Sequence, residues 1–508
     1  MKEQADVVII GSGAGGATVG GELAEAGARV VFLEAGKDLD ITFGSSGHFA
    51  STQTFSRFAK DNLLWHEQYA GRPWRTDMGE CAGGGTTTYG GVLEESLPRD
   101  YDMWPISYAE LSPHVELAKR RYHVGRWPLS ELSHGAKLLA EASGGQLGPV
   151  QSAFNQEPWE EYGVFHGRCK QCRCCLLGCK NNSKANALTI TLPKAKWYGA
   201  EVRDNCLATR LQTDRGGSRV TSVRYLERTG TSPLDEKFEE REIFADKVIL
   251  AAGSMMTPMI LHWSGSSGRA LGNSSGQVGK NLRAHFFFHL LGVLRRDDVR
   301  TYQGQVVEVC DRFNNYDSGF LTEFNMVAPP ALMSMLIDVA KVENLDKMLG
   351  LPFKRLMRQY NRLINVTPMA RNEDDGFTDH FVLLHPTEKN QYKLPLPQVR
   401  LDPSQQEKIW MENGLQRAME ILLRADADPQ KIWPGRMDVV HKVGTCRMGK
   451  SAGDSVVDLH GKSWDLDNLW IADGSIFPAP LLANCALIIY SLAYRIADKI
   501  LGRTIPAA

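Results

Sequence analysis

The hydrophobic pattern at the start of the chain predicts a strand, a turn, a helix and a second strand. Residues 7–10 form an unbroken run of valine and isoleucine, which is the pattern of a strand buried on both faces. Residues 17–26 are rich in alanine and predict a helix. Residues 29–33, apolar after Arg29, predict another short strand that ends on Glu34. This order is typical of a β-α-β unit in a parallel sheet.

Glycines fill the turn between the first predicted strand and the helix. Gly11 permits a tight turn, Gly13 lets the backbone approach a pyrophosphate, and Gly16 lets the helix pack closely on the strand. The helix N-terminus then faces the negative charge of a phosphate. Glu34 can accept hydrogen bonds from ribose hydroxyls, and its charge disfavours a 2′-phosphate, so the expected ligand is a dinucleotide other than NADP. The alternative is a glycine-rich turn in another kind of α/β domain.

Further along the chain the pattern is less regular but still predicts elements. A helix should begin after Ser107 or Ser112, either of which can cap it. The short apolar run at 306–309 predicts a strand, and residues 333–364 predict helices. A final helix should extend to about Leu501.

Composition excludes several classes of protein. The 508 residues contain 58 lysines and arginines against 59 aspartates and glutamates, a net charge of −1, so neither nucleic acid nor a strongly charged partner is expected. No apolar run is long enough to span a membrane, and the chain runs into its first strand without a signal peptide. These features predict a cytoplasmic protein of two large domains with no transmembrane segment.

A second glycine-rich stretch occupies residues 83–91 and reads Gly-Gly-Gly-Thr-Thr-Thr-Tyr-Gly-Gly. Its glycines let the backbone pass close to a flat or anionic ligand, and the threonine hydroxyls can donate hydrogen bonds to that ligand. The alternative is a flexible turn, in which a threonine run and a tyrosine between two glycine clusters are unusual. We therefore expect this stretch to contact a bound cofactor.

Longer motifs accompany the two glycine-rich stretches. Together they resemble the glucose–methanol–choline (GMC) oxidoreductases over nearly the whole chain. The resemblance is most specific near the C-terminal end, where residues 441–449 read His-Lys-Val-Gly-Thr-Cys-Arg-Met-Gly and residues 469–478 read Leu-Trp-Ile-Ala-Asp-Gly-Ser-Ile-Phe-Pro. The other matching segments are residues 104–111, 246–258 and 278–285.

The resemblance implies non-covalently bound FAD and the oxidation of an alcohol. Many family members carry a histidine joined to the flavin just before the second glycine-rich stretch, whereas residues 78–82 here read Met-Gly-Glu-Cys-Ala. The implied fold is α/β, an FAD-binding Rossmann-like domain with a discontinuous α+β substrate-binding domain. The expected borders give the FAD-binding domain residues 1–150, 196–285 and 436–508, a cysteine-rich segment residues 151–195, and the substrate-binding domain residues 286–435. The expected FAD contacts are Gly11, Gly13, Ala14, Gly16, Glu34, Ala35, Gly84, Gly85, Thr86, Tyr89, Gly90, Ala252, Gly253, Asp473 and Gly474.

Alcohol oxidation requires a hydride acceptor, which a flavin supplies, and a base for the hydroxyl proton. A histidine suits the base because its ordinary pKa lies near neutral pH. The resemblance implies this role for His441, and it implies that Asn484 holds the substrate oxygen. Without the surrounding motifs, a structural histidine and a helix-capping asparagine would be the ordinary interpretations.

Five of the ten cysteines fall within residues 169–179. Thiolates this close together can hold an iron–sulfur cluster or zinc, and the candidate ligands are Cys172, Cys174, Cys175 and Cys179. Packed or disulfide-bonded cysteines without a metal are the third alternative. The segment resembles a cysteine-rich bacterial subgroup of the family, with aminoglycoside-pathway dehydrogenases and sugar dehydrogenases that hold a [3Fe–4S] cluster, and it also resembles long-chain alcohol oxidases. Nearby lysines and arginines are expected to lower the pKa of these thiols.

The resulting hypothesis is FAD-dependent oxidation of a hydroxyl on a small sugar-like or aminoglycoside substrate, a reaction of secondary metabolism. A long-chain or other primary alcohol is the alternative substrate. A flavin-bearing electron-transfer subunit without catalysis of its own is the alternative function. The electron acceptor stays open among oxygen, a dye-like acceptor and a redox subunit, and an iron–sulfur cluster would favour the redox subunit because it takes single electrons.

Overall fold

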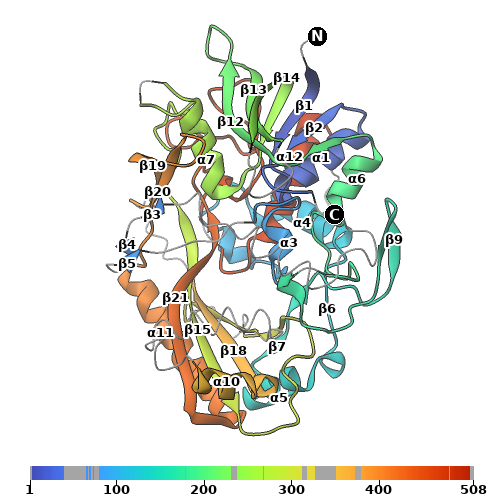
Figure 1. Cartoon of the computed structure of the whole chain (residues 1–508), viewed down its shortest axis with the longest axis vertical. Helices are drawn as coiled ribbons and strands as arrows, with labels where there is room; N and C mark the ends of the chain where they lie inside the picture. The colour runs from blue at the N-terminus through green and yellow to red at the C-terminus, as the bar shows by residue number, and fades with distance from the viewer. Residues whose placement is uncertain are drawn as a thin grey trace.

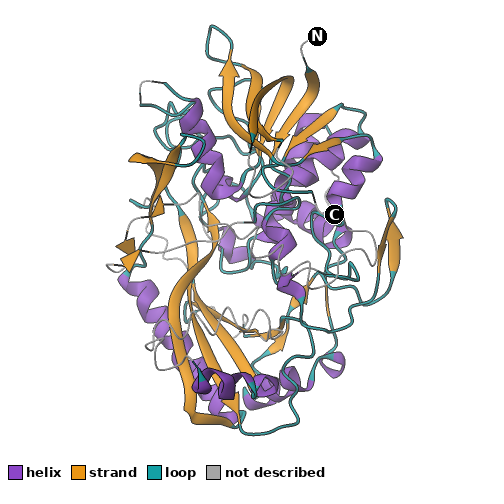
Figure 2. Cartoon of the chain, in the orientation of Figure 1, coloured by secondary structure: helices purple, strands orange, loops and turns teal. Residues whose placement is uncertain are grey.

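The computed structural model contains two large β-sheets, one in each half of the molecule, with helices packed beside both (Figures 1 and 2). The structure describes residues 3–38, 65–66, 68–69, 72–73, 79–177, 179–229, 237–266, 268–311, 317–325, 350–371, 379–479 and 481–503. In the view of Figure 1 the first sheet lies at the top and the second at the bottom.

The first sheet is built around the predicted N-terminal strand. Its order is β11-β2-β1-β14-β13-β12, with β22 beside β14. The strands β11, β2, β1, β14 and β22 pair in parallel, whereas β12 and β13 are antiparallel. Segments far apart in the sequence therefore lie side by side, which confirms the predicted Rossmann-like α/β fold. The strands are β1 (Gln4–Ile10), β2 (Val30–Leu33), β11 (Glu201–Arg203), β12 (Cys206–Thr213), β13 (Val220–Arg228), β14 (Phe238–Leu250) and β22 (Leu469–Ile471).

Helices cover this sheet, and their ends follow local sequence signals. The first helix begins at Ala14, earlier than the alanine-rich run, because Gly13 supplies the extended residue at its N-cap. Ser107, not Ser112, caps the helix that follows it: its Oγ accepts from the Glu110 amide at 3.3 Å, and the Glu110 carboxylate accepts from the Ser107 amide at 2.9 Å. The helices are α1 (Ala14–Glu25), α4 (Tyr108–Arg121), α6 (Thr191–Trp197), α7 (Gly253–Ser264) and α12 (Ala486–Leu501).

The second sheet is antiparallel, with the order β21-β15-β18-β17-β16-β7. The strand predicted at 306–309 is confirmed as β16, one residue later. The prediction of helix over 333–364 is wrong at its end: β18 begins at Leu363, where alternating β-branched residues favour a strand, and residues 326–349 lie outside the described part. The strands are β7 (Gly148–Pro149), β15 (Arg283–Leu294), β16 (Val307–Cys310), β17 (Phe320–Asn325), β18 (Leu363–Ala370) and β21 (Ala427–Val443), and α11 (Gln405–Arg424) packs on them.

Two long strands connect the halves of the molecule. β15 and β21 pair along most of their length, and each runs across one of the expected domain borders near residues 285 and 435. The borders themselves stay predictions, but this pairing brings the end of β21 to the edge of the first sheet. The C-terminal motifs that follow β21 can therefore contact both halves.

The remaining elements are small. A three-stranded sheet has the order β19-β20-β3, and the other short strands form two-stranded ribbons. No helix in the described part of the chain is long and apolar enough to cross a membrane. These elements are β3 (Trp65–His66), β4 (Gln68–Tyr69), β5 (Arg72–Pro73), α3 (Gly85–Thr88), η1 (Pro98–Tyr101), β6 (Gly125–Arg126), η2 (Leu129–Glu131), α5 (His134–Ala142), β8 (Gln151–Ser152), β9 (Trp159–Glu161), β10 (Val164–His166), η3 (Cys175–Leu177), α10 (Leu351–Met357), η4 (Tyr360–Arg362), β19 (Phe381–Lys389), β20 (Pro395–Arg400) and η5 (Gly474–Ile476).

Candidate active site

Three glycines in the turn after β1 and at the start of α1 leave no room for a side chain. Gly11 has a φ of +92°, and a Cβ there would lie 2.4 Å from the Ala251 carbonyl oxygen. A Cβ on Gly15 would lie 1.5 Å from the carbonyl oxygen of Ala472, and one on Gly16 would lie 2.1 Å from that of Gly11. The glycines therefore let two distant segments, at Ala251 and Ala472, close around the N-terminus of α1.

Glu34 follows β2 and joins the first glycine turn to its neighbours. Its carboxylate is buried and accepts hydrogen bonds from the Ser12 amide at 3.0 Å, the Ser12 hydroxyl at 2.7 Å and the Gly36 amide at 2.9 Å. Burial raises the pKa of this carboxyl. A carboxylate has about four acceptor sites, so one is left for a ribose hydroxyl beside Ala35.

The second glycine-rich stretch meets the first. It contains the short helix α3, which begins after Gly84, and a Cβ on Gly84 would lie 3.0 Å from the Cα of Gly13. The Thr86 hydroxyl donates to the Gly83 carbonyl, and the Tyr89 hydroxyl donates to the Ala185 carbonyl at 2.5 Å. These two hydroxyls are bonded within the chain, so the parts left to face a ligand are the backbone of Gly84, Gly85 and Gly90.

Asp473 ties η5 to the start of α7. Its buried carboxylate accepts from the Gly253 amide at 2.9 Å, the Thr257 hydroxyl at 2.6 Å and the Ser475 amide at 2.8 Å. The aspartate thus holds Ala252, Gly253 and Gly474 at the same edge of the sheet as the first glycine turn. These segments fit the pyrophosphate part of a dinucleotide, because they meet at the N-terminus of α1, where Gly11 and Gly15 leave no room for a Cβ against Ala251 and Ala472.

His441 lies at the end of β21 in a left-handed conformation with a φ of 57°, which is unusual for a residue with a side chain. Its Nδ1 lies 2.9 Å from Nδ1 of His285, and Nε2 of His285 lies 2.5 Å from the Leu481 carbonyl oxygen. A carbonyl only accepts, so Nε2 of His285 donates and its Nδ1 accepts from His441. The Nε2 of neutral His441 is consequently left as an acceptor.

Charge and burial favour this neutral form. Burial lowers the pKa of His285 to about 4. Burial, with smaller effects of His285 and Lys442, holds the pKa of His441 well below its ordinary value. Both imidazoles are therefore neutral near pH 7, and the unprotonated Nε2 of His441 can accept a proton.

Asn484 occupies the position next to that nitrogen. Its Nδ2 lies 3.3 Å from Nε2 of His441, and the residue is buried. The helix-capping interpretation of Asn484 is wrong, because Cys485 is the N-cap of α12 and no side chain caps that helix. The structure therefore brings the two predicted catalytic residues together.

Sequence reasoning assigned no role to two further residues of this site. His285 lay in a quoted motif, but nothing in that motif indicated that it contacts His441. Glu323 lies on β17, is 6% exposed and hydrogen-bonds with the side chain of Asn484. Burial raises the pKa of its carboxyl to about 7. No sequence signal marks Glu323, because it is one acid in an otherwise ordinary strand.

Comparison with known proteins identifies the family of the chain. A GMC oxidoreductase family model matches residues 5–287, and a second one matches residues 382–493. The chain belongs to the GMC oxidoreductase family. The GMC chain is an FAD-dependent alcohol oxidoreductase, as predicted.

Relatives of this GMC oxidoreductase match it over nearly the whole chain. It is 26% identical to a 2-methyl-1,2-propanediol dehydrogenase of Mycolicibacterium austroafricanum, covering 99% of this chain and 96% of the relative. It is 27% identical to a 6'''-hydroxyparomomycin C oxidase of Streptomyces lividus, covering 97% and 91%. The structure of a formate oxidase of Aspergillus oryzae has the same fold, with a TM-score of 0.72 at 16% identity over 99% of this chain and 98% of that one.

The cysteine-rich segment of the GMC chain lies beside the second glycine-rich stretch. Cys169, Cys172, Cys174, Cys175 and Cys179 line one cavity of about 120 Å³, and none forms a disulfide. The Lys184 ammonium donates to the carbonyls of Thr87 at 2.9 Å, Tyr89 at 3.0 Å and Cys175 at 2.7 Å, which joins the segment to the stretch. Among the described residues, no group of three or more His, Cys, Asp or Glu side chains is arranged to hold a metal.

The prediction that basic neighbours lower the thiol pKa values is wrong for three of the cysteines. Burial raises the pKa of Cys175 to about 12, and the pKa values of Cys169 and Cys174 are also raised. Arg173 does not offset this effect, because its guanidinium turns inward to the Glu308 carboxylate at 2.7 Å.

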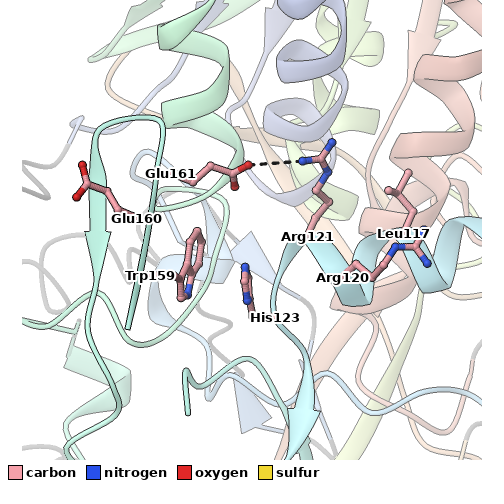
Figure 3. A pocket seen from close by; sticks show the side chains of 7 residues that line it. All are labelled: Leu117, Arg120, Arg121, His123, Trp159, Glu160 and Glu161. Atoms are coloured by element: carbon pink, nitrogen blue, oxygen red, sulfur yellow. Dashed lines mark ion pairs between the residues drawn. The ribbon is translucent and has the colours of Figure 1, made fainter. Parts of the chain in front are cut away.

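A surface groove of about 510 Å³ lies on another side of the cysteine-rich region (Figure 3). The Trp159 ring is stacked between the rings of His123, with centroids 4.0 Å apart, and His166, with centroids 3.8 Å apart. Arg121 and Glu161 form an ion pair at 3.6 Å on its rim. The groove carries both charges, and none of the residues predicted to act in the site lines it.

Proposed function

We propose that this oxidoreductase oxidises a hydroxyl of a small sugar-like or aminoglycoside substrate, with His441 as the base. The observation that carries the proposal is the direction of the hydrogen bonds from His441 to His285 and on to Leu481. That direction leaves an unprotonated Nε2 beside Asn484. A base in this state accepts the hydroxyl proton directly, and such transfer contributes roughly 10²–10⁴ in rate.

The chain's own groups act on the two ends of the O–H bond. The substrate hydroxyl would take the place between Asn484 and His441, so that its proton moves to Nε2 of His441 as the carbon–hydrogen bond breaks. Nδ2 of Asn484 donates to the substrate oxygen as negative charge develops there. When bound, FAD supplies the hydride acceptor.

The proposed FAD contacts lie on five segments of the chain. Backbone of the first glycine turn and the start of α1 would bind the pyrophosphate, and Glu34 with Ala35 would bind the adenosine ribose. The second glycine-rich stretch, Ala252–Gly253 and Asp473–Gly474 would hold the rest. We also propose that FAD is bound non-covalently, because residues 78–82, just before the second glycine-rich stretch, contain no histidine. Of these, Met78 lies outside the described residues.

The substrate class rests on the relatives, one of which is described as a 6'''-hydroxyparomomycin C oxidase. A long-chain or other primary alcohol is the alternative substrate, and an electron-transfer subunit without catalysis is the alternative function. Anaerobic mixing with aminoglycosides, sugars and fatty alcohols, followed by flavin absorbance, separates the substrates. A flavin that none of them reduces would overturn the proposal.

The deciding variant is His441→Ala. Its flavin reduction by substrate should fall by roughly 10²–10⁴ while FAD stays bound, because only the base is lost. The control is His134→Ala, which removes an exposed histidine on α5 and should leave the rate unchanged. An electron carrier would keep its function in His441→Ala, and that result would favour the alternative.

The acceptor depends on the cysteine-rich segment. A [3Fe–4S] cluster on Cys172, Cys174, Cys175 and Cys179 would pass single electrons to an outside redox subunit, whereas packed thiols leave oxygen or a dye-like acceptor. Their lining of one cavity supports a cluster, while the absence of a metal-binding arrangement among the described residues opposes one. The visible spectrum of purified protein with iron and sulfide analysis decides between them.

A further inference from the structure

The Asn484 amide donates in two directions. One Nδ2 hydrogen bond goes to Nε2 of His441 at 3.3 Å, and the other goes to the carboxylate of Glu323. The Oδ1 atom of Asn484 and the Oε1 atom of Glu323 are both buried and have no hydrogen-bond partner among the described residues. The amide is therefore held through its nitrogen, and no described residue holds its oxygen.

A flipped amide would be repelled on both sides. Oδ1 would then face the lone pair on Nε2 of His441 and the negative charge of Glu323, and both of these only accept. Of these two groups, His441 keeps its lone pair at all pH values near neutrality, because its pKa is depressed. The charge on Glu323 is the part of the arrangement that can change.

We propose that Glu323 is a positioning residue that keeps the nitrogen of Asn484 turned toward His441 and the substrate oxygen. The proposal rests on the proposed function, since it assumes that the reacting hydroxyl lies between Asn484 and His441. An ionised Glu323 accepts the second N–H of the amide and so selects the orientation that donates to the substrate. A neutral carboxyl instead donates to Oδ1 of Asn484 and stabilises the flipped amide.

The groups around Glu323 keep its ionisation near neutral pH. Burial disfavours its charge, and the nearby carboxylates of Glu94 and Asp311 disfavour it further, while the bond from Asn484 favours it. Glu94 is itself paired with the Arg126 guanidinium at 2.7 Å, and Cys310 contacts the same carboxylate. On β18 the residue paired with Glu323 is the uncharged Thr367.

The expected pH profile has a definite sign. Above pH 7 the Glu323 carboxylate holds the amide, and flavin reduction is fast. As the pH falls through about 7 the carboxyl takes up a proton and the amide is released, so the rate falls. His441 does not produce this decrease, because it stays neutral to much lower pH.

The test is stopped-flow flavin reduction by substrate between pH 5.5 and 9 in holoenzyme carrying Glu323→Gln. The glutamine amide can donate to Oδ1 of Asn484 as well as accept from its Nδ2, so it no longer selects one orientation. The rate at high pH should therefore fall about tenfold and lose its decrease near pH 7. Complete loss of such a donor costs roughly 10²–10³, and a flipping amide loses it only part of the time. Glu323→Asp should restore part of the rate and the pH dependence, and Glu388→Gln, an exposed carboxyl on β19, should change neither.

Two further measurements make the outcome decisive. Infrared spectra of the holoenzyme should contain a protonated-carboxyl band that titrates near pH 7 and is lost in Glu323→Gln. In an Asn484→Ala background, Glu323→Gln should add no further loss of rate, since there is no amide to orient. A Glu323→Gln variant that binds FAD and keeps the wild-type rate and pH profile overturns the proposal. If His441→Ala also keeps its rate, the proposed function has failed instead.

Discussion

The residues around the proposed base His441, which we call the catalytic corner, and the cysteine-rich segment are two buried polar regions that are organised differently. In the catalytic corner, Leu481, His285, His441, Asn484 and Glu323 form one series in which each hydrogen bond fixes the direction of the next. In the cysteine-rich segment the thiols share a cavity, and no disulfide joins them.

The two regions depend on their neighbouring residues in different ways. The corner needs the correct tautomer and amide orientation, which only partners within hydrogen-bond distance can supply. The segment is held in place by a buried ion pair, Arg173 with Glu308, and by Lys184, whose ammonium binds three carbonyls. Backbone bonds hold it as well: the Arg173 amide donates to the Gly304 carbonyl at 2.9 Å, and the Ser183 amide donates to the Cys179 sulfur at 3.2 Å.

Apart from loss of the proposed base itself, the largest effect on catalysis is expected in the corner, at His285. In His285→Leu the Nδ1 of His441 loses its acceptor, so His441 can carry its proton on Nε2 and cannot act as a base. Flavin reduction should fall about 10²-fold, at the lower end of the roughly 10²–10⁴ that a general base contributes. The matched control is His262→Leu, which removes another histidine whose pKa burial lowers to about 4. Equal rates in the two variants would contradict the directional series.

The next effect is expected in the cysteine-rich segment, and it is a loss of stability. Arg173→Met leaves the buried Glu308 carboxylate without its cation, which should reduce the free energy of unfolding by about 3–5 kcal/mol. The double variant Arg173→Met with Glu308→Leu should recover most of that loss, because a buried ion pair replaced by apolar groups is often neutral. Urea unfolding measures both. The rate of flavin reduction per bound FAD should stay unchanged, and a large decrease would mean that the two regions are coupled.

Much of the first half of the molecule was predictable, because its signals are local. The run at residues 7–10, the glycines and the acid at Glu34 lie within one β-α-β unit, where Gly11, Gly15 and Gly16 meet backbone too closely for a side chain. Ser107 was one of two candidate caps, and only the reciprocal bond with Glu110 decided between them. The start of β18 was wrongly predicted as helix, because a short run of alternating apolar and polar residues can also form the end of a helix.

The site was predictable only where a motif carried it. His441 and Asn484 came from the resemblance, and they lie 3.3 Å apart although 43 positions separate them in the chain. His285 and Glu323 could not be assigned, because their roles depend on which atoms they face across β15, β17 and β21. The direction of the thiol pKa shift was predicted wrongly. The sequence contains the basic residues, but it does not contain the direction in which Arg173 points or the depth at which the thiols are buried.

The smallest expected effect tests the segment thiol by thiol, in protein shown by analysis to contain no iron. Cys172 is the exposed member of the group, whereas Cys175 is buried and burial raises its pKa to about 12. Because the thiolate is the reactive form, iodoacetamide at pH 8 should label Cys172 at least about ten times faster than Cys175. Peptide mass spectrometry over time measures both, and urea-unfolded protein, in which burial is lost, should label them at similar rates.

Equal labelling in the folded protein would mean that the segment opens in solution, so that Arg173 and Lys184 hold it less firmly than the hydrogen bonds hold the catalytic corner. Protection of Cys172 as well would show that a ligand other than iron occupies the thiols. The segment would then be fixed by bonds to that ligand, much as the corner is fixed by its hydrogen bonds.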